Sequence, residues 1–260
     1  MDAATGTTTA PREALAVAGG VVLDWAYALW RQVASIAQGR VTTTTVHPPA
    51  GAPGGASGNE SSARGAKDDV VLIPGIYEPA GFMDPLRRWL QERGHRVVVL
   101  PELGYNRRTI PATAEVAAAR LRELGVRDAV VIAHSKGGLV GKLLMTAYTH
   151  EGLVARMLAI GTPFEGARYS RFAPTRPLRS FYPGHPVLGS LAKNLVVNAR
   201  IVSVGARFDP LVGRSTRLEG GHNIVLPVIG HFWILASPEL RAVVDDFLQD
   251  EVGGSGEQAG

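Results

Sequence analysis

Short runs of aliphatic and β-branched residues alternate with longer amphipathic segments from residue 69 to residue 248. Short apolar runs fit buried strands, whereas apolar residues three or four apart over a longer stretch fit helices. Strands are expected at 69–73, 96–100, 128–133, 154–160, 199–204 and 223–228, and helices at 82–93, 111–124, 136–149 and 238–248. This alternation predicts βαβ units. The expected fold class is therefore α/β, with a doubly wound, mostly parallel sheet and helices on both faces.

Residues 13–38 carry a separate helical pattern, N-terminal to the strands. Apolar residues recur three or four apart across this segment, which predicts an amphipathic helix. Its uninterrupted apolar part, 14–23, ends at Asp24 and is shorter than the ~20 residues of a spanning helix. Only Arg12 precedes that part, where a secretory signal would have a basic segment.

We rank a helix docked on its own domain or on a partner first for residues 13–38. A membrane-surface helix comes second, and a cleaved signal or an anchor third. This ranking favours a protein that is cytoplasmic or peripherally membrane-associated through this segment over a secreted or anchored one.

A stretch rich in Pro, Gly, Ser and Ala, from His47 to Lys67, separates this helix from the strands. Such a composition without periodicity is typical of a flexible linker. We therefore divide the chain into residues 1–66, which hold the helix and the linker, a domain at 67–250 and a flexible tail at 251–260.

The composition argues against several classes of function. The net charge is +4 and no dense block of Lys or Arg accompanies it, so nucleic-acid binding is not expected. The 260-residue chain has no cysteine, which rules out disulfides, thiolate zinc sites and cysteine nucleophiles. It also lacks clustered His and Asp ligands and the glycine-rich loops that bind phosphates or dinucleotides. Neither a metal nor another cofactor is expected.

A serine stands between the third predicted strand and the helix that follows it. The sequence Ala133-His134-Ser135-Lys136-Gly137 approximates the G-x-S-x-G nucleophile elbow, in which a sharp turn exposes the serine hydroxyl above the sheet. Ala133 replaces the first glycine but is still small. Ser135 is therefore predicted to be a nucleophile, and the ring of His134 to point away from the site.

A serine nucleophile needs a base, and the base needs a carboxylate that orients it. Asp209 follows the fifth predicted strand and is the best acid, with Glu219 as its rival. His231 follows the last predicted strand, whereas His222 precedes it, so only His231 falls at the same sheet edge as Ser135. We predict that Asp209 and His231 serve Ser135.

Two backbone amides are expected to bind the oxyanion that forms in acyl transfer, and each can be worth about 3–4 kcal/mol. One belongs to Lys136, the residue after the nucleophile, whose side chain is incidental to that role. The other is assigned to Ile76, in the loop 74–77 after the first predicted strand, where Gly75 lets the backbone approach the site.

Five motifs, taken in order, resemble those of the α/β-hydrolase superfamily and, within it, the bacterial lipase/esterase branch. The motifs are PGIY at 74–77, AHSKGG at 133–138, IGTPFEGA at 160–167, ARFDPLV at 206–212 and IGHFWIL at 229–235. The resemblance covers roughly Asp69 to Gln249. It implies an α/β-hydrolase fold and hydrolysis of carboxylic esters by a triad of Ser135, Asp209 and His231. Many members have His in place of Pro74, and this departure removes no catalytic atom.

The long excursion 164–198 between two predicted strands is typical of a lid or cap over the site. Aromatic residues in and near it fit an apolar acyl-binding wall, and they fit simple packing of the insertion about equally well. The predicted substrate-binding residues are Tyr77, Phe82, Phe164, Phe232 and Trp233. The natural ester and its acyl length are not predicted. Alternatives on the same residues are an acyltransferase, an amidase, a polyester depolymerase and a non-catalytic binding module.

Overall fold

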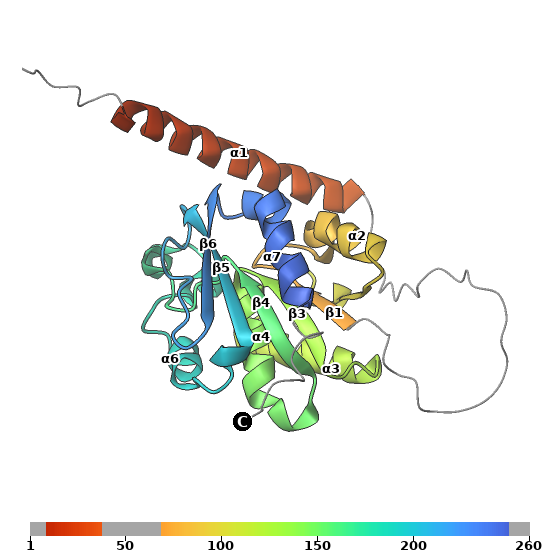
Figure 1. Ribbon diagram of the computed structural model, residues 1–260. Helices are drawn as coiled ribbons and strands as arrows, with labels where there is room; N and C mark the ends of the chain where they lie inside the picture. Colours follow the sequence, from red (N-terminus) through yellow and green to blue (C-terminus); the bar gives the residue numbers. More distant parts are fainter. Residues whose placement is uncertain (1–8, 38–68, 250–260) are drawn as a thin grey trace, which may run out of the picture.

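The computed structural model describes residues 9–37 and 69–249, so the predicted linker and C-terminal tail lie outside the described residues. Within these ranges six strands form one sheet in the spatial order β2-β1-β3-β4-β5-β6, and every neighbouring pair is parallel. The strands are β1 (Asp69–Ile73), β2 (Arg96–Val99), β3 (Ala129–His134), β4 (Val154–Ile160), β5 (Ile201–Phe208) and β6 (His222–Ile229). The predicted α/β class is confirmed (Figure 1).

Helices cover both faces of the sheet. Figure 1 shows α1, α2 and α7 on one side and α3, α4 and α6 on the other. The α-helices are α1 (Thr9–Ala37), α2 (Asp84–Glu92), α3 (Ile110–Glu123), α4 (Lys136–Ala147), α5 (Arg176–Arg179), α6 (Pro186–Lys193) and α7 (Pro238–Gln249). Short 3-10 helices are η1 (Ala80–Met83), η2 (Pro101–Leu103), η3 (Thr149–Glu151), η4 (Arg168–Phe172), η5 (Asn198–Arg200) and η6 (Trp233–Ala236).

Each face of the sheet has its own hydrophobic core, because alternate residues of a strand point to opposite sides. In β1, Val71 and Ile73 join the core under α3 and α4. Val70 and Leu72 join the core under α2 and α7. Strands buried on both faces need an uninterrupted apolar run, and that is the pattern by which the sequence revealed them.

Most boundaries lie within two residues of the sequence prediction, and two of the differences have a clear cause. β5 continues to Phe208 rather than ending at 204, because its last residues pair with β6. The added residues include a glycine and an arginine and so carry no apolar signal. The helix predicted at 82–93 starts as the turn η1, and α2 begins at Asp84 with Pro85 in its first turn, where a missing N–H loses no hydrogen bond.

The order of the strands reverses at β1. β2 lies on one side of β1, whereas β3 to β6 follow in sequence order on the other. A crevice opens at such a point beyond the carboxyl ends of the central strands, and ligands of open α/β sheets bind there. The loop 74–79 after β1 and the turn at Ser135 after β3 both lead to this crevice.

α1 packs on the same domain, against η1, the end of β6 and η6 (Figure 1). The helix therefore takes the first-ranked arrangement for residues 13–38. The side that it packs against the domain is not the predicted apolar stripe. The buried side includes Asp24, Arg31 and Ser35, while much of the predicted apolar stripe faces outward. The exposed large apolar side chains of α1 are Leu15, Val22, Leu23, Trp25, Leu29, Trp30 and Val33.

The charged side chains of α1 explain why this side of the helix is the covered one. By length and composition alone, Glu13–Ser35 is apolar enough to cross a membrane, with a mean hydropathy of 1.2. Its two central charged side chains, Asp24 and Arg31, are however buried against backbone groups of the domain. A buried charge is tolerated when hydrogen bonds satisfy it. Periodicity alone could not show which face of the helix is covered.

Candidate active site

Ser135 occupies the sharp turn between β3 and α4. Its backbone has φ 51° and ψ −120°, and a positive φ is uncommon for a residue with a side chain. The amide of Ser135 donates to the carbonyl oxygen of Ile160 at the end of β4, at 2.7 Å, which anchors the turn. A non-glycine residue held in such a conformation is typical of a functional site.

Two glycines after Ser135 let α4 start close to the sheet. A Cβ atom on Gly137 would lie 2.2 Å from the carbonyl oxygen of Ile73. One on Gly138 would lie 2.0 Å from the side-chain oxygen of Thr162. Both distances are far below van der Waals contact. The glycines of the elbow therefore permit the close approach of α4 to the loops after β1 and β4.

Asp209 and His231 form a buried acid–base pair. Nδ1 of His231 lies 2.7 Å from Oδ2 of Asp209. The other carboxylate oxygen, Oδ1, accepts hydrogen bonds from the amides of Leu211 (2.8 Å) and Val212 (3.0 Å). Burial opposes ionisation, but His231 and these hydrogen bonds outweigh it and lower the pKa of Asp209 below its usual 3.8. Asp209 is thus a fixed anion that orients His231.

Ser135 and His231 line the same cavity, which has a volume of about 220 Å³. Ile76 and Phe232 line it as well, and the insertion 164–198 forms one wall. The insertion residues that line the cavity are Ala167, Ser170, Ala173, Leu178 and Phe181. A mostly apolar space thus adjoins Ser135 and His231.

The amide of Ile76 is free at the rim of this cavity. In the described part of the chain, the amide of Gly75 donates to Glu78 (2.6 Å) and that of Tyr77 to Tyr105 (2.8 Å), whereas no acceptor is found for that of Ile76. Lys136 is the first residue of α4, and the first amides of a helix have no partner within the helix. Within residues 9–37 and 69–249, both predicted oxyanion donors are therefore unpaired amides.

The side chain of Lys136 has a structural role that the sequence did not reveal. Its buried Nζ donates to the carbonyl oxygen and Oδ1 of Asn106, both at 2.8 Å, and to the carbonyl oxygen of Arg108 at 2.5 Å. Burial and, less strongly, Arg108 lower the pKa of Lys136 to about 7. Asn106 in turn donates to the carbonyl oxygen of Pro74 at 2.7 Å. Lys136 thus ties the elbow to the loop that carries Ile76.

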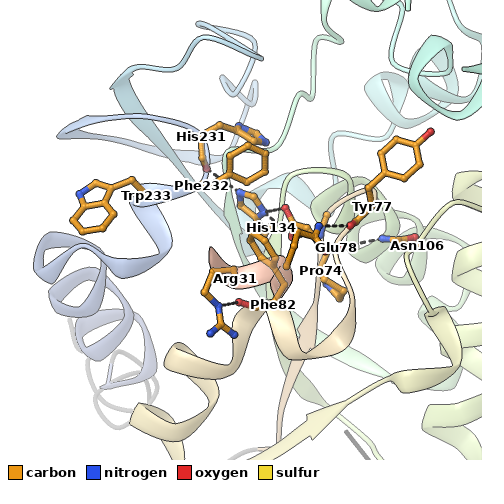
Figure 2. A network of polar contacts seen from close by, with 12 residues as sticks. Arg31, Pro74, Tyr77, Glu78, Phe82, Asn106, His134, His231, Phe232 and Trp233 are labelled. Carbon is orange, nitrogen blue, oxygen red and sulfur yellow. Dashed lines mark hydrogen bonds and ion pairs between the residues drawn. The ribbon is translucent and has the colours of Figure 1, made fainter. Parts of the chain in front are cut away.

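His134 has a carboxylate partner, although the sequence assigned none to it. Its Nδ1 lies 2.8 Å from Oε1 of Glu78, and its Nε2 lies 3.0 Å from the carbonyl oxygen of His231 (Figure 2). The ring is fully buried behind His231 and does not line the cavity. Burial opposes the charge, but Glu78 and the two hydrogen bonds outweigh it and raise the pKa of His134 above its usual 6.5.

Of the five predicted substrate-binding residues, Phe232 is found among those that line the cavity, and the other four are not. Phe82 and Phe164 are core residues, at 1% and 8% exposure. Trp233 packs edge-on against α1, and the hydroxyl of Tyr77 bonds to the insertion instead. The structure therefore does not support an aromatic wall made of these four. Core packing and contacts with α1 and the insertion hold these four side chains instead.

The groups around this cavity include a hydroxyl, an imidazole and backbone amides. Among residues 9–37 and 69–249, no three His, Asp or Glu side chains gather as metal ligands would. Ser135 can supply a nucleophile, and His231 a base that Asp209 orients. The amides of Ile76 and Lys136 can supply oxyanion donors. These are the groups that acyl transfer requires.

No protein-family model and no curated protein sequence matches the chain. Solved structures, in contrast, match the fold of the chain. Lipase BlEst2 of Bacillus licheniformis, in mature form, has a TM-score of 0.58 at 15% identity, over 74% of this chain and 96% of that one. Aspergillus fumigatus lipase B has 0.57 at 19% identity, over 65% and 49%. A protein of Mycobacterium tuberculosis H37Rv named as a non-heme bromoperoxidase, BpoC, has 0.55 at 17%, over 74% and 95%.

At these identities the likeness concerns the fold. The shared architecture agrees with the parallel sheet, its reversal at β1 and the turn at Ser135. The chain has the α/β-hydrolase fold.

Proposed function

We propose that the protein is a serine hydrolase of lipase or esterase type, which cleaves carboxylic esters through an acyl-enzyme intermediate. The observation that carries this proposal is the cavity shared by Ser135, in its strained turn, and His231, bonded to Asp209. Two lipases among the solved structures of the same fold support it.

The reaction follows from the positions of these groups. His231 removes the proton of the Ser135 hydroxyl as its oxygen attacks the ester carbonyl. The amides of Ile76 and Lys136 bind the oxyanion of the tetrahedral intermediate, and Asp209 stabilises the imidazolium. His231 then protonates the leaving alcohol. Water attacks the acyl-enzyme by the same route, which releases the acid and frees Ser135.

Ser135→Ala tests the nucleophile directly. We expect the variant to lose hydrolysis of p-nitrophenyl esters and labelling by a fluorophosphonate probe, with an unchanged circular dichroism spectrum. His231→Ala should lose activity as well, whereas its matched control, His222→Ala, should keep it, because His222 is exposed at the opposite end of β6. Full turnover by Ser135→Ala would refute the mechanism.

We further propose that the outer face of α1 contacts a lipid surface. Between Ala14 and Val33, no exposed position of α1 carries a charged side chain. Trp25 and Trp30 are both more than half exposed on this helix, and tryptophan favours the boundary between lipid and water. Monomeric soluble proteins rarely expose a continuous apolar face of this kind. An ester at a lipid surface would then lie near the site.

Co-sedimentation with vesicles of phosphatidylcholine, with and without phosphatidylglycerol, tests this contact. We expect the full chain to bind, the double variant Val22→Asp and Leu29→Asp to lose binding, and Val196→Asp to keep it. Val196 is exposed and apolar but lies outside α1. Failure of the unmodified chain to bind, or a stable dimer that covers α1 in solution, would contradict the proposal.

A further inference from the structure

A carboxylate from α1 binds the loop that carries His231. Oδ2 of Asp24 accepts a hydrogen bond from the amide of His231 at 3.0 Å. Oδ1 accepts from the amides of Phe232 (2.6 Å) and Trp233 (2.7 Å). Asp24 has no exposed surface. One side chain thus accepts hydrogen bonds from three consecutive amides, which lie between β6 and α7 and so outside any strand or α-helix.

The backbone of His231 is consequently held at both of its polar atoms. Its amide donates to Asp24, and its carbonyl oxygen accepts from Nε2 of His134, which Glu78 holds in turn (Figure 2). The imidazole is fixed at its far end by Asp209. These contacts fix the backbone of His231 and the Nδ1 side of its ring, which leaves Nε2 as the nitrogen that can act as a base.

The same helix also binds the loop on the other side of the site. Nε2 of Gln32 donates to the carbonyl oxygen of Tyr77 at 2.7 Å, next to the predicted oxyanion donor Ile76. Arg31 donates to the carbonyl oxygens of Gly81 and Phe82 in η1 (Figure 2). α1 therefore contacts the loops that carry the predicted base and one predicted oxyanion donor.

Small residues make this close approach feasible. A Cβ atom on Gly230, whose φ is 120°, would lie 2.4 Å from Oδ1 of Asp24. One on Gly20 of α1 would lie 2.5 Å from the side chain of Ile229. Glycine thus stands on both sides of the contact between α1 and the end of β6, where any other residue would push the helix away.

We propose that α1 is part of the catalytic architecture and that Asp24 is a positioning residue for the base. The proposal rests on the proposed hydrolase function. Asp24 acts through the backbone of His231 and does not touch substrate. Its loss should misplace the imidazole, and a misplacement of ~1 Å can cost on the order of 100-fold in rate. Binding of a small ester should be affected far less, because α1 is separated from the cavity by the two loops.

Steady-state kinetics of the full chain on a soluble p-nitrophenyl ester test the proposal. We expect Asp24→Asn to lower kcat by about 10- to 100-fold with little change in KM. Gln32→Met, which is milder and retains Asp24, should lower kcat to a smaller extent by releasing Tyr77. The matched control is Glu13→Gln, the same chemical change at an exposed carboxylate of α1, which should match the unmodified protein.

Hydrogen exchange of the His231–Trp233 amides supplies a readout that needs no activity. Faster exchange in folded Asp24→Asn, together with the fall in kcat, would support the proposal. An unchanged kcat, or a raised KM at constant kcat, would overturn it. If the unmodified protein hydrolyses no ester, the proposed function fails on its own. Hydrogen exchange in Asp24→Asn would then test on its own whether Asp24 holds the loop 231–233. Unchanged exchange would overturn the positioning role of Asp24 as well.

Discussion

The rings of His134 and His231 lie 4.8 Å apart, centroid to centroid, but have different surroundings. His134 is enclosed between Glu78 and the carbonyl oxygen of His231, so both of its ring nitrogens have acceptors. That arrangement suits an imidazolium, which has two donors and no acceptor. The raised pKa of His134 and the acceptors at both of its ring nitrogens favour an ion pair with Glu78. His231 is the ring that lines the cavity with Ser135.

We expect an NMR titration to give His134 a pKa above its usual 6.5, and Glu78→Gln to lower that pKa. The direction in which stability changes with pH follows from this raised pKa. Because the pKa is raised in the folded state, the stabilisation is fully present below pH 6.5 and is lost as the pH rises through the folded pKa. A neutral His134 at pH 6 would contradict the ion pair.

At the scale of residues, the sequence predicts groups that directly follow a strand. It does not reveal groups from distant segments that meet only in the folded protein. Ser135, Asp209 and His231 could be placed at one sheet edge from strand order alone, and they do meet there, although their catalytic roles are still predictions. Glu78 and Asp24 carried no motif. Asp24 lies 207 positions from His231, and only the docking of α1 brings the two together.

At the scale of elements, Gly137 at the start of α4 contrasts with Gly189 in α6. We expect Gly137→Ala to destabilise the protein by more than the typical ~1 kcal/mol of a point mutation, because its Cβ would meet the carbonyl oxygen of Ile73, which cannot move away. Gly189→Ala in α6 meets no atom within 4 Å and should stabilise by roughly 0.5–1 kcal/mol. Urea unfolding measures both. Equal effects would show that backbone contact is not why Gly137 is needed.

The elements themselves were predicted well where one signal dominated. β1 and β4 match their predicted ranges, because strands buried on both faces leave a run of mostly apolar residues. α1 was predicted as a helix, yet the face it buries was not. Amphipathic patterning assumes that the apolar side is covered. α1 instead buries Asp24 and Arg31, and half-buries Gln32, against backbone partners.

At the scale of the molecule, the size of the cavity predicts a preference among esters. A volume of about 220 Å³ is below the ~300–1,000 Å³ of pockets that hold drug-sized ligands. We therefore expect faster hydrolysis of p-nitrophenyl butyrate than of the palmitate. Phe181→Ala, which removes an aromatic ring from the insertion wall, should shift the preference toward longer chains. A preference for palmitate in the unmodified protein would refute this expectation.

The docking of α1 has a practical consequence for anyone who handles the protein. By sequence, residues before the linker look dispensable, and trimming them is the natural first step toward better solubility. That cut would remove the partners of three amides, at residues 231–233, and of three carbonyls, at residues 77, 81 and 82. Each buried polar group left unpaired costs about 1–3 kcal/mol. Solubility is better sought by polar substitutions on the outer face of α1, with the helix kept in place.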